Sequence, residues 1–93
     1  MTYTVNWTAN ALQELASVWM AASNRNAVTH TANDIDDILE VFPYTVGEST
    51  FDIVREYTRP PLGVEYEVND AIRRVVVLSV WSTDTGRPSP TGN

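Results

Sequence analysis

The sequence contains no cysteine and no lysine, and each absence removes a class of function. Without cysteine the 93 residues form no disulfide, thiolate metal site or thiol nucleophile, so stability must come from packing. Six arginines carry all the positive charge against twelve acidic residues, which leaves a formal net charge of −6. Non-specific nucleic-acid binding depends on clustered cations. This balance therefore argues against a protein that binds along a phosphate backbone.

Long apolar segments are also missing. No run approaches the ~20 residues of a membrane span, and the first residues, "MTYTVNW", lack the basic and apolar regions of a secretory signal. The sequence therefore predicts a cytoplasmic protein with no membrane partner. With 43% hydrophobic residues the composition is that of a globular domain, and a chain this short forms one core.

Hydrophobic periodicity predicts an α+β fold in the order β-α-α-β-β-β, with a helix hairpin packed on one face of a twisted, mainly antiparallel sheet. A first strand at 2–7 is followed by Thr8, a suitable N-cap, and by helices expected at 9–23 and 25–42. Pro43 ends the second helix. A turn or short edge strand is expected around "YTVGES", and three further strands at 51–58, 62–68 and 72–81.

The predicted domain covers residues 1–81, and the Ser-, Thr-, Gly- and Pro-rich residues 82–93 are expected to form a flexible tail. Strand alternation and helical spacing also predict which side chains lie between the helices and the sheet. They are Trp7; Leu12, Leu15, Ala16, Trp19 and Ala22; Val28, Thr31, Ala32, Ile35, Ile38, Leu39 and Phe42; and Leu62, Val64, Tyr66, Val68, Ile72, Val76, Leu78 and Val80. The opposite face of the sheet is expected to carry Gly63, Glu65, Glu67, Arg73, Val75, Val77, Ser79 and Trp81.

Several dispersed features together resemble the RelE/ParE superfamily of small bacterial toxins. They are the aromatic-ended strand "YTVNWT", the helix "ANALQELASVW", the ending "ILEVFP", Gly47, the arginine in "FDIVRE", and "PPLGVEYEVND…RRVVVLSVW", spanning about Tyr3 to Trp81. The resemblance implies the toxin of a type II toxin–antitoxin system, a class with roles in plasmid stabilization, and a cognate antitoxin that packs over it. It implies the ribosome with its messenger RNA, or DNA gyrase, as a target, and no cofactor. A homodimer stays open.

In the nuclease branch of this family, cations hold RNA on the sheet face away from the helices, and a titratable group near the end of the last strand moves a proton. The matching position here is Trp81, whose indole N–H is no acid or base near neutral pH. Glu65 and Glu67 would repel phosphate on that face. We therefore predict no catalytic residue and judge ribosome-dependent endonuclease activity disfavoured. The alternative to an active toxin is a non-catalytic interaction module with the same fold.

Five residues form the candidate target or partner surface: Arg55, Arg59, Arg73, Arg74 and Trp81. The resemblance points to Arg55, and the alternative is that this arginine pairs with a neighbouring glutamate of the sheet. Arg59 is expected in solvent, while Arg73 and Arg74 point to opposite faces if their strand is regular. Trp81 either covers an edge of the sheet or anchors a partner, as aromatic residues do at interface hot spots.

The second helix carries the single histidine, His30, and an acidic run at Asp34, Asp36, Asp37 and Glu40. A lone imidazole without a second ligand is typical of a surface residue. The carboxylates at helical spacing are typical of a solvated helix face. We predict no metal site.

Overall fold

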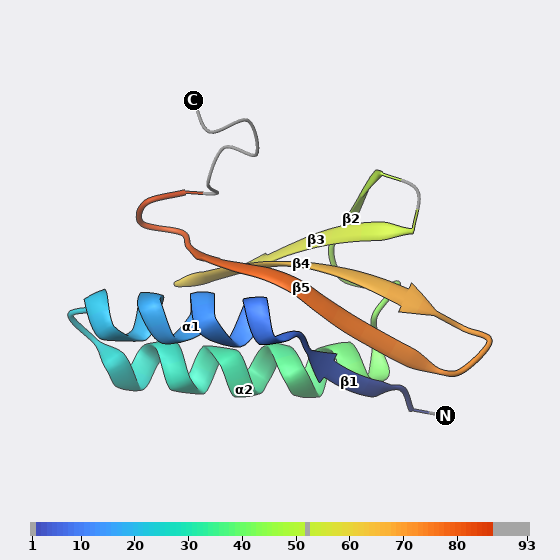
Figure 1. The fold of residues 1–93 in the computed structure, drawn as a ribbon. Helices are drawn as coiled ribbons and strands as arrows, with labels where there is room; N and C mark the ends of the chain where they lie inside the picture. The colour runs from blue at the N-terminus through green and yellow to red at the C-terminus, as the bar shows by residue number, and fades with distance from the viewer. Residues whose placement is uncertain (1, 52, 87–93) are drawn as a thin grey trace.

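The computed structural model describes residues 2–51 and 53–86, and it has two layers (Figure 1). The elements are β1 (Thr4–Trp7), α1 (Ala9–Ala21), α2 (Arg25–Val41), β2 (Glu48–Phe51), β3 (Val54–Arg59), β4 (Leu62–Asn69) and β5 (Arg74–Ser82). The sheet has the order β1-β5-β4-β3-β2, in which β1 runs parallel to β5 and the other neighbours are antiparallel. Both helices cover one face of this sheet, which confirms the predicted α+β fold.

The helices begin where the sequence predicts, because polar side chains satisfy their first backbone N–H groups. The Thr8 Oγ1 accepts from the amide of Ala11 at 3.0 Å, and the Asn24 Oδ1 accepts from the amide of Ala27 at 3.1 Å. The segment predicted as one strand from residue 51 is divided, since residue 51 ends β2 and β3 begins at Val54.

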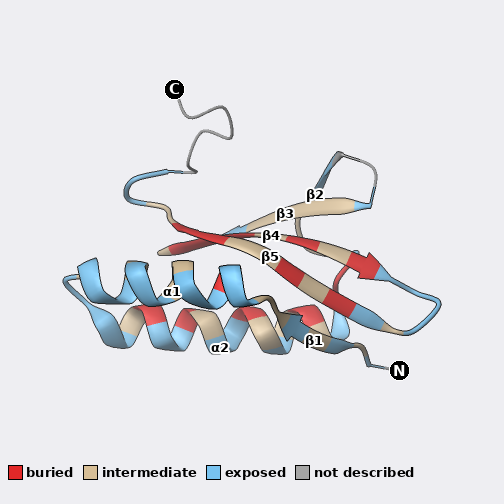
Figure 2. Ribbon diagram, in the orientation of Figure 1, coloured by how far each residue is buried: buried red, intermediate tan, exposed pale blue. Residues whose placement is uncertain are grey.

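The core lies between the helices and β4–β5, and a β-bulge changes which residues of β5 enter it (Figure 2). Across β4 and β5 the register shifts after Glu65, so one extra residue, Leu78, lies in β5 between the partners of Glu65 and Tyr66. An extra residue reverses the alternation of a strand. The residues of β5 that enter this core are consequently Val75, Val77 and Val80, while Trp81 is buried on the opposite face of the sheet, where it is paired with Gly63.

The prediction by strict alternation was therefore right for Val80 and wrong for the first half of β5. Val76 and Leu78 are only half-buried, and Ile72 lies in the turn before the strand, 57% exposed. The four predicted core residues of β4, from Leu62 to Val68, are all buried. The prediction holds along all of β4 because the extra residue lies in β5 and leaves the alternation of β4 unchanged.

Helix α1 also turns a different stripe to the sheet from the one predicted. Ala11 is fully buried, with Leu15, Val18 and Ala22 packed against the core. Leu12, Ala16 and Trp19 are exposed, so the prediction that Trp19 belongs to the core was wrong. The two stripes are adjacent and share Leu15 and Ala22, and the small Ala11 allows α1 to lie close to β5.

Helix α2 follows its prediction more closely, with Val28, Thr31, Ile35 and Leu39 as its buried residues. Phe42 was expected in the core but lies past the end of the helix, 51% exposed. In the described part of the chain, neither helix is long and apolar enough to cross a membrane.

The chain continues in an ordered turn beyond β5. The amide of Thr83 donates to the carbonyl of Pro61, and that of Gly86 to the carbonyl of Ser82, each at 2.9 Å. The remainder of the expected tail, 87–93, lies outside the described residues.

Candidate partner-binding site

The structure distributes the four arginines of the predicted surface over both faces of the sheet. Arg55 opposes the core residue Tyr66, so it lies on the helix side, while the neighbouring Glu56 lies on the outer side. Arg59 also lies on the helix side, where its Nη2 is 3.5 Å from the Asp34 carboxylate in an exposed ion pair. Only Arg74, opposite Asn69, begins β5 on the outer side.

Two of these arginines, Arg55 and Arg73, belong to one cluster at an end of the sheet, together with three residues that were not predicted as site residues. The Asp70 carboxylate accepts hydrogen bonds from the hydroxyls of Tyr3 at 2.7 Å and of Tyr44 at 2.8 Å. The Arg73 guanidinium lies 4.6 Å from the centroid of the Tyr3 ring, and that of Arg55 lies 5.7 Å from the Tyr44 ring. We call these five residues the Tyr–Asp–Arg cluster.

Arg55 holds the loop between α2 and β2 through the backbone. Its Nη2 donates to the carbonyls of Tyr44 at 3.2 Å, of Val46 at 3.3 Å and of Gly47 at 3.1 Å. The buried hydroxyl of Tyr66 is 2.7 Å from the carbonyl of Pro43 and 3.0 Å from that of Val46, so it binds the same loop. These contacts fix the backbone that carries Tyr44.

Arg73 lies in the β4–β5 turn, in an unusual backbone conformation. Its φ is +52°, in the left-handed region that residues other than glycine rarely adopt. The turn is closed by a bond from the Arg73 amide to the Asp70 carbonyl at 3.3 Å. The Nε atoms of Arg73 and Arg55 are both buried without a hydrogen-bond partner in the described structure. The cluster thus contains backbone strain and uncompensated donors, which functional sites often retain.

The electrostatics of the cluster suit binding better than proton transfer. Hydrogen bonds from Tyr3 and Tyr44, with a smaller effect of the Arg73 charge, lower the pKa of Asp70 below its ordinary value. The bond to Asp70 in turn raises the pKa of Tyr3 and of Tyr44, with burial adding to the effect. At neutral pH the carboxylate is therefore charged and both phenols keep their protons.

Sequence reasoning found Arg55 and Arg73 but missed Tyr3, Tyr44 and Asp70. Asp70 is 67 residues from Tyr3 and 26 from Tyr44, so only the fold brings them together. The available signal was the pair "ND" in the turn before the last strand, because an aspartate in a turn can point its carboxylate toward other segments. Tyr44 is 50% exposed, so the cluster presents an aromatic ring to solvent.

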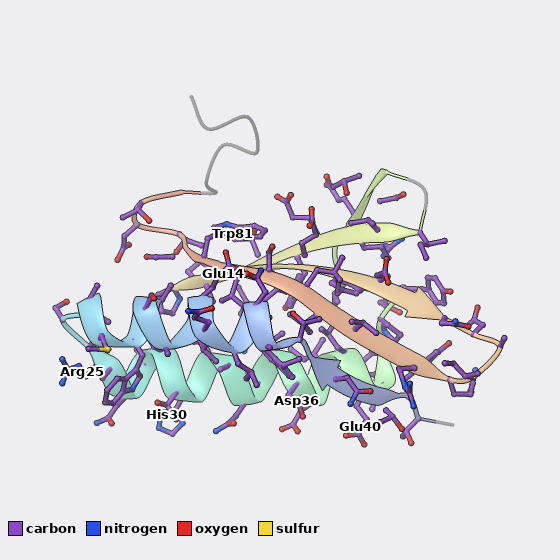
Figure 3. All side chains as sticks on the ribbon, in the orientation of Figure 1. Glu14, Arg25, His30, Asp36, Glu40 and Trp81 are labelled. Atoms are coloured by element: carbon purple, nitrogen blue, oxygen red, sulfur yellow. The ribbon has the colours of Figure 1, made fainter. Side chains whose placement is uncertain are left out.

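The outer face of the sheet carries Trp81 and several glutamates. Trp81 opposes Gly63, and its side chain lies on the side of β5 away from the helices (Figure 3). It is only 5% exposed, because the indole lies over Gly63 so closely that a methyl group there would overlap it. Trp81 therefore covers the sheet instead of projecting from it.

Across β2, β3 and β4, the residues Glu48, Glu56 and Glu65 lie directly opposite one another on this outer face. Like charges in such positions repel each other and would repel a phosphate chain.

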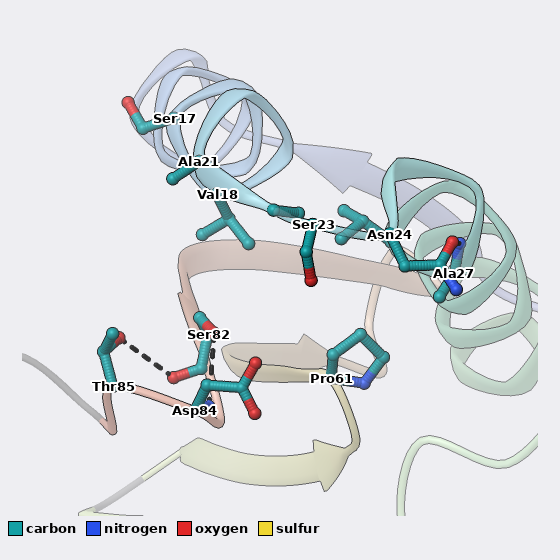
Figure 4. Close-up of a pocket in the computed structure, with 12 residues that line it drawn as sticks. Ser17, Val18, Ala21, Ser23, Asn24, Ala27, Pro61, Ser82, Asp84 and Thr85 are labelled. Carbon is teal, nitrogen blue, oxygen red and sulfur yellow. Dashed lines mark hydrogen bonds between the residues drawn. The ribbon is translucent and has the colours of Figure 1, made fainter.

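A separate cavity of about 460 Å³ lies near the turn between the helices (Figure 4). It is bounded by the end of α1, the start of α2, Pro61 and the turn after β5. Asp84 is the one ionisable residue among those that line it, and its amide donates to the Ser82 hydroxyl at 3.2 Å. One carboxylate beside alanines and valines does not form an acid–base pair.

On α2, the exposed His30 is not part of the group formed by Asp36, Asp37 and Glu40. Carboxylate oxygens of Asp36, Asp37 and Glu40 lie within 4.8 Å of one another, and Asp36 accepts a hydrogen bond from the Trp7 Nε1 at 2.9 Å. Asp37 is exposed and the other two are half-buried, and acidic groups at helical spacing are common on solvated helices without an ion.

Comparison with solved structures shows the same fold in bacterial toxins. The toxin–antitoxin complex RelBE2 from Mycobacterium tuberculosis matches with a TM-score of 0.74 and 20% identity, over 88% of this chain and 99% of the other. The chromosomal ParDE system of P. aeruginosa matches with a TM-score of 0.63 and 17% identity, over 86% and 95%. The isolated E. coli RelE toxin matches with 0.63 and 16%, over 96% and 89%. No family model and no curated protein sequence matches the chain.

Proposed function

Since the chain has the fold of the RelE and ParE toxins, we propose that it is the toxin of a type II toxin–antitoxin pair, or a descendant of one, and that it acts in the cytoplasm by binding a macromolecule. Two of the similar structures are toxin–antitoxin systems, which supports a cognate antitoxin as one partner. We assign the binding surface to the residues of the Tyr–Asp–Arg cluster and to Arg74 beside it.

The observation that carries this proposal is the Asp70 carboxylate bound by two tyrosine hydroxyls, with an arginine stacked on each ring. Tyrosine and arginine are enriched among residues that dominate binding energy. A side chain that is already ordered loses little entropy when a partner binds. The cluster therefore has both the composition and the rigidity of a binding hot spot.

Two features of the outer face support binding without RNA cleavage. An indole occupies the position from which a nuclease relative would supply a proton, and Trp81 is buried there. The glutamates that align across the strands oppose the approach of phosphates. If the chain is not toxic at all, the same features fit an interaction module that keeps the fold.

Induced expression in a bacterial host, with and without the gene next to its own, tests the proposal. We expect growth arrest that the neighbouring gene relieves, and co-purification of the two products. Tyr44→Ala should weaken the relevant complex by about 2 kcal/mol, close to thirtyfold, as truncation of a hot spot does. His30→Ala, which removes an exposed ring on α2, is the matched control and should leave the affinity unchanged.

The pattern of arrest identifies the target. Cleaved transcripts at ribosomes would refute the non-catalytic proposal, whereas an SOS response would indicate DNA gyrase. Normal growth at high expression, together with no partner from the adjacent gene, would refute the toxin assignment.

A further inference from the structure

Helix α1 exposes apolar side chains and no charge on its solvent side. Leu12 is 52% exposed, Trp19 40% and Met20 69%. The single charged residue of this helix, Glu14, turns toward the sheet, where its Oε1 accepts from the amide of Val80 at 3.2 Å. On a chain with a net charge of −6, this uncharged apolar face is a typical site of protein association.

The exposed face borders a groove between the two helices. A hollow of about 340 Å³ is lined by Leu12, Ala16, Trp19, Val28, Ala32 and Asn33, among others. A second hollow of about 200 Å³ shares Leu12, Ala32 and Asn33 with it and extends the groove to Trp7 and Asp36. The groove therefore runs along the helix hairpin from the Trp19 end to the Trp7 end.

The two ends of the groove carry opposite charges (Figure 3). At one end the Arg25 guanidinium lies 4.6 Å from the centroid of the Trp19 ring and donates to the carbonyls of Trp19 at 3.2 Å and Met20 at 3.1 Å. At the other end lie the carboxylates of Asp36 and its neighbours on α2. These contacts hold the cation at one end while the anions lie at the other.

We propose that a second copy of this chain occupies the groove, with its α1 antiparallel to the first and the two-fold axis passing near Ala16. In a two-fold interface the same patch contacts itself. An antiparallel arrangement then brings the Arg25 end of each copy to the acidic end of the other, so the charges are complementary. Leu12 would lie opposite Met20 of the second copy, and the small Ala16 allows close approach at the axis. This inference is independent of the proposed function.

The oligomeric state of the purified full-length chain, measured by sedimentation equilibrium, tests the proposal with a matched pair of variants. Ala16→Glu places two like charges at the axis and should weaken the dimer by tenfold or more, about 1.4 kcal/mol. Ala21→Glu makes the same change on the same exposed helix, outside the groove, and should leave the dimer unchanged. Glutamate and alanine are both good helix formers, and urea unfolding verifies that each variant is folded.

A charge exchange tests the orientation. Arg25→Glu and Asp37→Arg should each weaken the dimer, and the combined variant should recover it, because the two ends then attract again with reversed signs. A monomer at every concentration would overturn the proposal. So would a dimer that Ala16→Glu and Ala21→Glu affect equally, or a groove that only a different, co-purifying protein occupies.

Discussion

The contact between Trp81 and Gly63 predicts that a single added β-carbon at position 63 destabilises the fold. A β-carbon on Gly63 would overlap the indole of Trp81, so the ring must move or the strands must separate. Gly63 itself has no positive φ, so its backbone conformation does not require glycine. The cost of Gly63→Ala is therefore overpacking alone, and overpacking of a well-packed site costs about 1–3 kcal/mol.

The cost should disappear when the ring is absent. In a Trp81→Leu background, alanine at position 63 finds space, and replacing glycine within a strand then stabilises the chain by roughly 0.5–1 kcal/mol. The two substitutions should therefore couple by about 2 kcal/mol or more in a double-mutant cycle. Urea unfolding followed by far-UV circular dichroism measures the free energy of unfolding of each variant without depending on tryptophan fluorescence.

Gly86→Ala is the control for this cycle. Nothing lies within 4 Å of a β-carbon at Gly86, but its φ of +80° favours glycine. That substitution should lower the free energy of unfolding by about 1 kcal/mol, because alanine is strained at this φ, and the loss should be the same with or without the Trp81 indole. If Gly63→Ala costs the same in both backgrounds, the indole does not lie over Gly63 and the account of the outer face is wrong.

Three further predictions concern the other end of the sheet. Tyr66→Phe removes a buried hydroxyl from the carbonyls of Pro43 and Val46, so urea unfolding should show a loss of about 1–3 kcal/mol. The pKa of Asp70 is lowered in the folded chain, so its stabilising effect is complete above its unfolded pKa and is lost as the pH falls through the folded value. The stability difference between the wild type and Asp70→Asn should thus shrink on acidification, and a difference that grows would refute the assigned hydrogen bonds. Arg73→Gly relieves backbone strain of about 1–2 kcal/mol and loses a stacking contact of about 0.5–1 kcal/mol, so its free energy of unfolding should rise slightly while its affinity for the partner falls.

Sequence patterns predicted the order of elements because N-caps, Pro43 and alternation act locally. They could not predict the bulge at Leu78, since "VVVLSV" contains apolar residues at both parities and either face satisfies the pattern. The α1 stripe was ambiguous for a similar reason, because adjacent stripes share Leu15 and Ala22 and only packing against β5 selects Ala11. Arg55 and Arg73 were found by residue type and resemblance. Asp70, which accepts from Tyr3 and Tyr44, was not found, because these contacts join segments distant in sequence.

The location of strain in this molecule bears on where it functions. The left-handed non-glycine residue among the described residues is Arg73, and both buried guanidinium Nε atoms without partners belong to the Tyr–Asp–Arg cluster. A buried donor without an acceptor costs about 1–3 kcal/mol, and glycine at position 73 would remove the backbone strain. Selection for stability alone would favour removal of these costs. Their coincidence in one cluster that is otherwise fixed by Asp70 and the α2–β2 loop therefore favours retention for binding.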